Sequence, residues 1–166
     1  MNWYISDTHF GHERIIKLAR RPFKTVEEMD ETLARRWNEC VKPEDTVYHL
    51  GDVAFGSEKK QREILSSLSG RKILVYGNHE KNLALLAECG FKEQHPCLTV
   101  QLHGTPVYLV HESPPSLEAL PPHCMYCLHG HVHNKPSRHP FLNIAVDLWK
   151  FGPISEDEIA DNLDIR

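Results

Sequence analysis

The sequence predicts an α/β fold in which two β-sheets pack together and helices cover the outside. The first half alternates β-prone runs with helical patterns, and the second half holds mainly β-prone runs. A third observation concerns function, because five of the β-prone runs are followed by side chains that can bind a metal. In open α/β sheets, ligands gather beyond the carboxyl ends of the strands, so these five ends can meet at one site.

Alternating elements fill the first half of the chain. The expected order is a strand at 2–6, a helix at 25–40, a strand at 46–50, a helix at 57–68, a strand at 72–76 and a helix at 81–88. The helix at 25–40 has Thr25 as its expected N-cap, and Glu28 three residues later completes a capping box. This βαβαβ alternation predicts parallel strands joined by right-handed crossovers.

The second half is richer in strands. Residues 97–102 and 106–110, separated by His103-Gly104-Thr105, predict a β-hairpin, and further strands are expected at 125–129 and 142–146. Ser155 and Glu158 form a second capping box, which predicts a short helix near the C-terminus.

Length and composition are those of one folded domain spanning residues 1–166. The contents of 40 % hydrophobic and 25 % charged residues are ordinary for a soluble globular protein. The longest apolar runs are only strand-length, and the start of the chain has no signal-like segment. We therefore expect a cytoplasmic protein that does not interact with membranes.

The net charge of −4 argues against a protein-wide electrostatic grip on nucleic acid. The basic pairs Arg20-Arg21, Arg35-Arg36 and Lys59-Lys60 are isolated, and we interpret them as solvated helix faces. A nucleotide, or a nucleic-acid end acting as a substrate, can still bind at a metal cluster.

Potential metal ligands stand just beyond five expected strands. The segments are Ile5-Ser6-Asp7-Thr8-His9, His49-Leu50-Gly51-Asp52, Tyr76-Gly77-Asn78-His79, Leu109-Val110-His111 and His129-Gly130-His131-Val132-His133. Residues two apart, such as Asp7 and His9, are expected to project to the same side of an extended strand end. A glycine precedes three of the candidate ligands, where the missing Cβ lets the backbone turn sharply and approach the site.

These segments supply seven candidate ligands, which are too many for one tetrahedral ion and suit two ions that share a carboxylate. They are Asp7, His9, Asp52, Asn78, His111, His131 and His133. Two ions about 3.5–4 Å apart can hold a bridging hydroxide and clamp a phosphoryl group for in-line attack. The mixture of carboxylate, amide and imidazole ligands favours manganese, iron, cobalt or zinc over calcium.

Each segment alone also has a simpler interpretation. Asp7 can be a turn residue, Gly-Asp and Gly-Asn are common turn formers, and paired histidines occur on many surfaces. All five segments, however, follow an expected strand. This shared structural context favours a metal site over five unrelated turns. A separate alternative is a zinc knuckle at Cys124 and Cys127, which have CxxC spacing near several histidines.

Taken in order, the motifs DxH, GD, GNHE, H and GHxH resemble those of the calcineurin-like metallophosphoesterases over nearly the whole chain. Residues 6–12, 47–52 and 143–147 are similar to segments of the small stand-alone phosphoesterases of bacteria and phages within that family. The resemblance implies one phosphoesterase domain with a four-layer α/β/β/α sandwich and two mixed sheets. It also implies two divalent transition-metal ions, with manganese favoured and iron, zinc, nickel or cobalt as alternatives.

The resemblance also implies roles for individual residues. It assigns Asp7, His9, Asp52 and His133 to one metal and Asp52, Asn78, His111 and His131 to the other, with Asp52 bridging. It makes His79 the catalytic residue, which donates to the leaving-group oxygen or to the developing charge. Many relatives carry an acidic residue three positions after the bridging aspartate, where this chain has Phe55.

Further residues are candidates for orienting ligands or touching phosphate, namely His12, His49, Glu80, Asn134 and Asp147. His49 can equally be a buried strand histidine.

The expected function is hydrolysis of phosphate esters, with diesters favoured because the short chain has no large insertion to cap the site. A small phosphate ester or a nucleotide is the expected substrate. The alternatives are a nuclease or nucleotide pyrophosphatase and, in a different class, a non-catalytic metal-binding interaction module.

Overall fold

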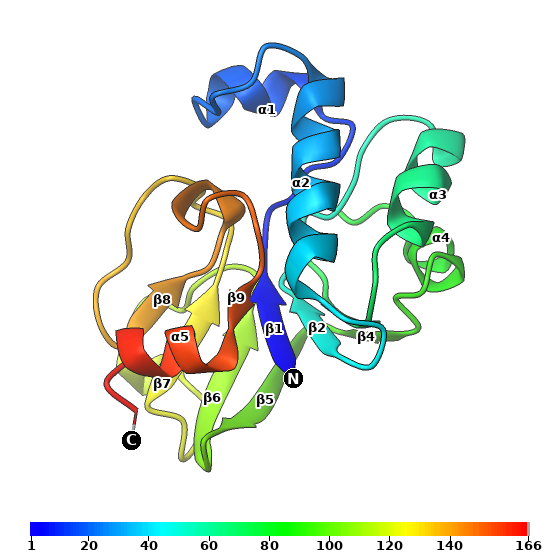
Figure 1. Cartoon of the computed structure of the whole chain (residues 1–166). Helices are drawn as coiled ribbons and strands as arrows, with labels where there is room; N and C mark the ends of the chain where they lie inside the picture. The colour runs from blue at the N-terminus through cyan, green and yellow to red at the C-terminus, as the bar shows by residue number, and fades with distance from the viewer. Residues whose placement is uncertain (166) are drawn as a thin grey trace.

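In a computed structural model, which describes residues 1–165, two β-sheets pack together and helices flank them (Figure 1). The strands are β1 (Asn2–Ile5), β2 (Thr46–His49), β3 (Arg71–Val75), β4 (Glu93–His95), β5 (Cys97–Leu102), β6 (Thr105–Val110), β7 (Tyr126–His129), β8 (Phe141–Asn143) and β9 (Ile154–Ser155). The helices are α1 (Glu13–Leu18), α2 (Val26–Cys40), α3 (Glu58–Ser66), α4 (Leu83–Glu88) and α5 (Glu156–Asn162), with short 3₁₀ helices η1 (Leu117–Ala119) and η2 (Val146–Leu148). The predicted α/β fold with two mixed sheets is confirmed.

The first sheet has the strand order β4-β3-β2-β1-β9. Strands β1 to β4 are parallel, as the βαβαβ pattern predicts, and β9 joins the edge antiparallel to β1. Ile5 pairs with His49 and His49 with Leu74, so β1, β2 and β3 end side by side. This register brings the segments after the three strands to the same edge of the sheet.

The second sheet has the order β5-β6-β7-β8. The predicted hairpin is confirmed, with β5 and β6 antiparallel around His103 and Gly104, whose φ angles of 49° and 81° suit a tight turn. Strand β8 is shorter than the predicted 142–146. The chain leaves the second sheet after Asn143 because Ala145 forms a β-bridge with Ser6, at the end of β1. The ends of the two sheets are thereby joined.

Two hydrophobic cores hold the layers. One lies between the first sheet and the helices, with Leu33 and Trp37 of α2 packed in the same cluster as Val47 and Leu74. The other includes residues of both sheets, namely Tyr4 and Val75 from the first, with Leu50 just after β2, and Leu102, Val107, Leu109 and Leu128 from the second. Helix α5, which contacts β1 and β9, adds Ile159 to this second core.

Both predicted N-caps are present, but only one closes a full capping box. The Thr25 hydroxyl accepts from the Glu28 backbone N–H at 3.1 Å, whereas the Glu28 carboxylate accepts from the backbone N–H of Lys24 at 2.8 Å. The reciprocal bond therefore falls one residue earlier than predicted. At α5, Ser155 and Glu158 form the complete box.

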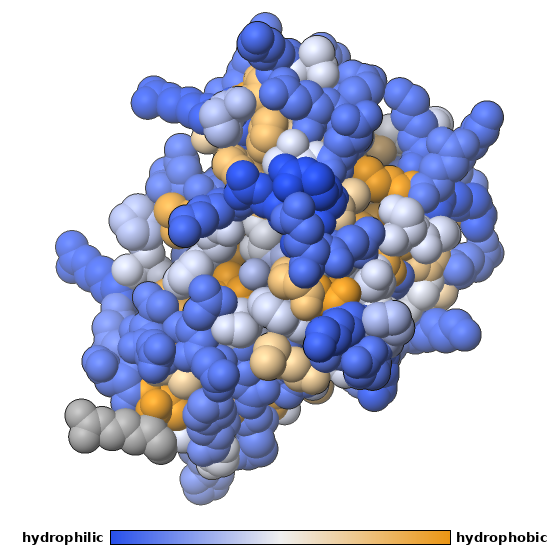
Figure 2. Space-filling view, in the orientation of Figure 1, coloured by the Kyte–Doolittle hydropathy of each residue, from blue (hydrophilic) through white to orange (hydrophobic). Residues whose placement is uncertain are grey.

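The visible surface is mostly hydrophilic, with apolar residues scattered over it (Figure 2). Among residues 1–165, no helix combines the length and the apolar character that crossing a bilayer would require.

We predict that Ser155→Ala lowers the free energy of unfolding by about 1 kcal/mol, because the first turn of α5 loses its N-cap. Urea denaturation would measure the change. Ser116→Ala is the matched control, since Ser116 precedes η1 without a side-chain capping bond. Equal losses in the two variants would contradict the capping role.

Candidate metal centre

The candidate site is built from the segments that follow β1, β2, β3, β6 and β7. Backbone hydrogen bonds fix these segments to one another. Asp7 N–H donates to Gly51 O and His9 N–H to Asp52 O, both at 3.0 Å, while Gly130 N–H donates to His111 O at 2.9 Å. The first two bonds join loops of the first sheet and the third joins loops of the second sheet.

Five of the seven predicted ligands have left-handed backbone conformations. Their φ angles are 57° for Asp7, 53° for His9, 57° for Asp52, 69° for His131 and 50° for His133. The expectation that Asp7 and His9 project from an extended strand end is therefore wrong. Residues other than glycine rarely adopt such angles, and clusters of them are typical of functional sites.

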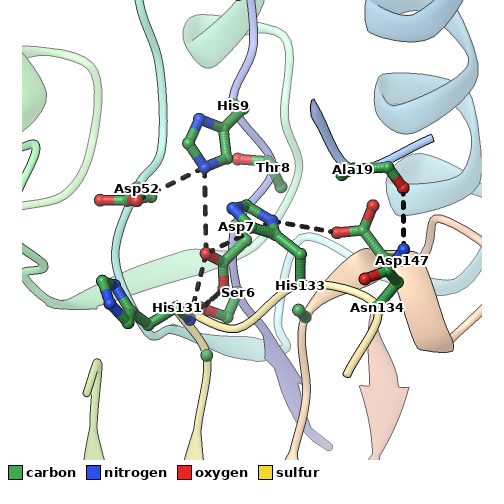
Figure 3. Close-up of polar contacts among 12 residues, drawn as sticks. Ser6, Asp7, Thr8, His9, Ala19, Asp52, His131, His133, Asn134 and Asp147 are labelled. Atoms are coloured by element: carbon green, nitrogen blue, oxygen red, sulfur yellow. Dashed lines mark hydrogen bonds and ion pairs between the residues drawn. The ribbon is translucent and has the colours of Figure 1, made fainter. Parts of the chain in front are cut away.

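The side chains converge on two buried carboxylates (Figure 3). His9 Nε2 lies 3.4 Å from Asp52 Oδ2 and 3.9 Å from Asp7 Oδ1. His111 Nε2 lies 3.6 Å from Asp52 Oδ2, and His133 Nδ1 lies 3.9 Å from Asp7 Oδ1. Two overlapping groups of potential ligands result, Asp7–His9–His133 and Asp7–Asp52–His111, each with ligand atoms within 4.8 Å of one another.

The remaining two predicted ligands lie beside these groups. Asn78 Oδ1 is 3.1 Å from His111 Nε2. The His131 ring centroid is 5.2 Å from that of His111, and the His131 backbone N–H donates to both carboxylate oxygens of Asp7 at 3.1 and 3.0 Å. Five of the seven side chains chosen from the sequence thus form the two groups, and those of Asn78 and His131 adjoin them through His111.

Hydrogen bonds on the far side of two imidazoles direct their other nitrogen toward the carboxylates. His111 Nδ1 donates to Leu50 O at 2.7 Å, which leaves a lone pair on Nε2 when the ring is neutral. That lone pair faces the oxygens of Asn78 and Asp52, an arrangement that a cation between them would satisfy. His9 Nδ1 lies 3.1 Å from His12 Nδ1, and His9 Nε2 is buried without a hydrogen-bond partner among residues 1–165. The free Nε2 lone pair of His111 and the unpartnered Nε2 of His9 are both suited to coordinating a metal ion.

The pKa shifts of His9 and Asp52 also favour metal binding. Burial lowers the pKa of His9, against the opposing pull of Asp52 and Asp7. Burial alone would raise the pKa of Asp52, but the nearby imidazoles of His9 and His111 outweigh it, and the pKa falls below its ordinary value. A neutral imidazole and an ionised carboxylate are the forms that coordinate metals.

Three glycines allow the ligand segments to approach closely. A Cβ on Gly51 would lie 2.6 Å from Gly77 N, and a Cβ on Gly77 would lie 2.7 Å from the His111 ring. A Cβ on Gly130 would lie 2.1 Å from Asp7 Oδ2. The expectation that these glycines serve close approach of the backbone is confirmed.

Glu80 holds two ligand segments together. Its carboxylate accepts from Val53 N–H at 2.8 Å and from Gly77 N–H, and these residues adjoin Asp52 and Asn78. Burial raises the pKa of Glu80, although the two backbone donors oppose the shift. Glu80 therefore orients the segments after β2 and β3.

Two further candidate histidines contact residues 7–9, the segment that carries the DxH motif. His49 is fully buried and contacts Thr8 Oγ1 at 2.9 Å through Nε2. His12 contacts His9, and burial together with His9 and His79 lowers the pKa of His12 to about 4. Both support the segment that carries Asp7 and His9.

His79 lies at the rim of the candidate metal centre. Its backbone N–H donates to Asp52 Oδ1 at 3.3 Å, while its side chain is exposed and its ring centroid is 6.4 Å from that of His9. Phe55, three positions after Asp52, stacks on the His9 ring with centroids 4.9 Å apart. An aromatic ring therefore stands at the position for which the family resemblance implied an acidic residue.

Asp147 and Asn134 adjoin His133 (Figure 3). Asp147 Oδ2 lies 3.3 Å from His133 Nδ1, so this carboxylate can orient the imidazole. Asn134 donates to Ala19 O at 3.2 Å, which ties the segment after β7 to the end of α1.

Arg21 is a residue of the site that the sequence analysis missed. Its interpretation as part of a solvated helix face is wrong, because it is 4 % exposed. Its guanidinium donates to both carboxylate oxygens of Asp147, at 2.9 and 3.0 Å, and to the carbonyls of Thr8 and Asp7, at 2.9 and 2.6 Å. Arg21 therefore links the backbone at Asp7 and Thr8 to the Asp147 carboxylate, which contacts His133.

The cysteines take no part in this cluster. Neither group of potential ligands contains a thiol within residues 1–165. Cys127 is buried in β7, and Cys124 lies 3.7 Å from Thr99 Oγ1 of β5. The zinc-knuckle alternative gains no support from this arrangement.

The fold and the site together define an α/β protein with a candidate metal centre of buried histidine and aspartate. Residues 3–140 match the model of the calcineurin-like phosphoesterase superfamily domain, and the chain belongs to this superfamily. Its members typically bind divalent metal ions.

Relatives match either most of the chain or about half of it. An uncharacterized protein of Methanocaldococcus jannaschii is 36 % identical over 95 % of this chain and 88 % of its own length. The gene 66 protein of Mycobacterium phage L5 is 44 % identical over 47 % of this chain and 39 % of its own length. The crystal structure of a protein of unknown function from Aquifex aeolicus is 32 % identical, with a TM-score of 0.79 and 98 % of each chain covered.

We predict that Arg21→Met lowers the free energy of unfolding by about 3 kcal/mol, because the buried Asp147 carboxylate loses its cationic partner. Chemical denaturation would measure the loss. Arg20→Met is the matched control, since Arg20 is exposed, and it should change stability by less than about 0.5 kcal/mol. A loss in Arg21→Met no larger than in the control would contradict the proposed link.

Proposed function

We propose that this chain is a metal-dependent phosphoesterase that hydrolyses phosphate esters, with phosphodiesters preferred. The observation that carries the proposal is the convergence of Asp7 and His9, after β1, with Asp52, after β2, and His111, after β6. In the part of the chain that the structure describes, the buried His9 Nε2 has no hydrogen-bond partner. Superfamily membership supports the same reaction class.

Seven side chains would hold two divalent transition ions, for which manganese is the favoured identity. They are Asp7, His9, Asp52 and His133 for one ion and Asp52, Asn78, His111 and His131 for the other. When bound, two such ions polarise a phosphoryl group and make a water molecule acidic enough to act as the nucleophile. The position of Asp52, near both His9 and His111, supports a bridging role.

His79 is proposed as the catalytic residue of the chain. Expulsion of an alcohol from a phosphate ester breaks the P–O bond and leaves negative charge on the alcohol oxygen. A protonated His79 donates its proton to this oxygen, and the neutral imidazole then regains a proton from water. Its exposed position beside Asp52 supports access to a substrate oxygen.

The preference for diesters rests on the openness of the site. Segments 50–57 and 76–82 connect strands of the first sheet directly to the next helices, and neither carries an inserted element. The exposed side chains of Asn78 and His79 lie in the second of these segments. An open rim accommodates the second ester group that a diester carries and a monoester lacks.

We predict that Asp52→Asn weakens Mn²⁺ binding by at least about 100-fold, beyond the loss typical of residues that only contact ligands, because a neutral amide bridges two cations poorly. Isothermal titration calorimetry measures the affinity, and a chelator should abolish hydrolysis by the unsubstituted protein. Asp161→Asn, at an exposed position of α5, is the control. Full metal content and activity in Asp52→Asn would refute the shared carboxylate.

We predict that His79→Ala lowers kcat by about 10²–10⁴-fold while leaving metal content near normal, because the residue donates a proton without coordinating. The loss should be smaller for nitrophenyl esters, whose leaving group needs little protonation, than for alkyl esters. His103→Ala, in the exposed hairpin turn, is the control. Loss of a metal, or an equal loss for both ester types, would remove the general-acid role.

A further inference from the structure

A cavity of about 320 Å³ adjoins the candidate metal centre on the side of His79. It lies between the segment after β2, which contributes Phe55, and the segment after β3, which contributes His79. Helices α3 and α4 supply the remaining walls, with Gln61 from the first and Leu85 from the second. The cavity is therefore continuous with the rim of the site.

The position of the cavity determines which part of a substrate can enter it. In an in-line displacement, the leaving group departs on the side opposite the nucleophile. His79, as the donor to the leaving-group oxygen, stands on that departing side. Because His79 itself lines the cavity, the cavity receives the leaving group.

The size and lining of the cavity select the kind of leaving group. A phosphate or a methyl group would leave most of the 320 Å³ unfilled, whereas the volume is in the range of small-molecule sites. Ala54, Leu85 and Leu86 provide apolar wall, and the Gln61 carboxamide, which donates to Gly56 O at 3.0 Å, provides polar contacts. This combination suits a flat ring with a polar edge.

The charges around the cavity disfavour a second phosphate. Glu58 and Lys81 bring opposite charges to its lining, and Glu80 adds a further carboxylate that is bonded to backbone N–H groups. Phe55 is held in place by its stacking on His9 and on His12, with centroids 4.9 and 4.4 Å apart. The rim thus offers a fixed aromatic group and no excess of positive charge.

We propose that this cavity binds a neutral nucleoside as the leaving group, so that nucleotide diesters are the substrate class. This inference rests on the proposed phosphoesterase function of the adjoining site. It adds a recognition site made by Phe55, Gln61, Leu85 and Leu86, none of which is among the proposed metal ligands.

The test compares two diesters that share a methyl group and differ in the second alcohol. One carries thymidine through its 5′ oxygen and the other carries tetrahydrofurfuryl alcohol, which presents a similar primary alcohol beside a ring ether but no base. With Mn²⁺ present, we expect kcat/KM for the thymidine ester to be about tenfold or more higher, the order that stacking of a base contributes. A ratio near one would overturn the inference.

Two variants test whether the thymine base binds in this cavity. Gln61→Trp fills the cavity from α3 and should bring the ratio close to one, whereas Lys59→Trp places the same side chain on an exposed position of α3 and should leave the ratio unchanged. An unchanged ratio in Gln61→Trp would show that the base binds elsewhere and would overturn the assignment to this cavity.

Binding of thymidine alone separates this inference from the proposed function. Amide signals of Gln61 and Leu86 should shift in NMR spectra of the ¹⁵N-labelled protein as thymidine is added. If neither ester is hydrolysed but these signals shift, the cavity assignment stands and the phosphoesterase proposal fails. If hydrolysis occurs without these shifts and with equal rates for both esters, the phosphoesterase proposal stands and the cavity assignment fails.

Discussion

The close approach of Gly130 to Asp7 is the contact on which the candidate site depends. It joins the segment after β7 in the second sheet to the segment after β1 in the first, and a Cβ at Gly130 would lie 2.1 Å from Asp7 Oδ2 and 2.0 Å from Ser6 Oγ. The next residue, His131, donates its backbone N–H to both oxygens of Asp7. Only a residue without a side chain allows the two sheets to share one cluster of ligands.

This arrangement stores strain that the surrounding hydrogen bonds must offset. Left-handed φ angles at five non-glycine residues cost on the order of 1–3 kcal/mol each in general. The Arg21 guanidinium bonds the Asp7 and Thr8 carbonyls, and Glu80 bonds the backbone N–H groups of Val53 and Gly77. Arg21 and Glu80 thus bond the backbone of the ligand segments rather than the ligand side chains. They fix the backbone so that the ligand side chains are positioned before any ion arrives.

Local sequence patterns were sufficient for much of this result. Strand ends are visible as apolar runs, so Asp7, Asp52 and His111 could be placed at the site before the structure was known. Arg21 could not, because its partner Asp147 is 126 residues away and an adjacent pair of arginines has the pattern of a solvated surface. Strand β9 has two residues and shows no period of its own, and its pairing with β1 arises only from the tertiary fold.

Anomalous diffraction from crystals of the Mn²⁺-loaded protein tests most directly whether these segments form a two-metal centre. Two peaks about 3.5–4 Å apart are expected, with Asp52 between them, His9 at one and His111 at the other. Peaks at the Cys124–Cys127 segment, or a single ion that leaves His9 Nε2 uncoordinated, would contradict the shared centre.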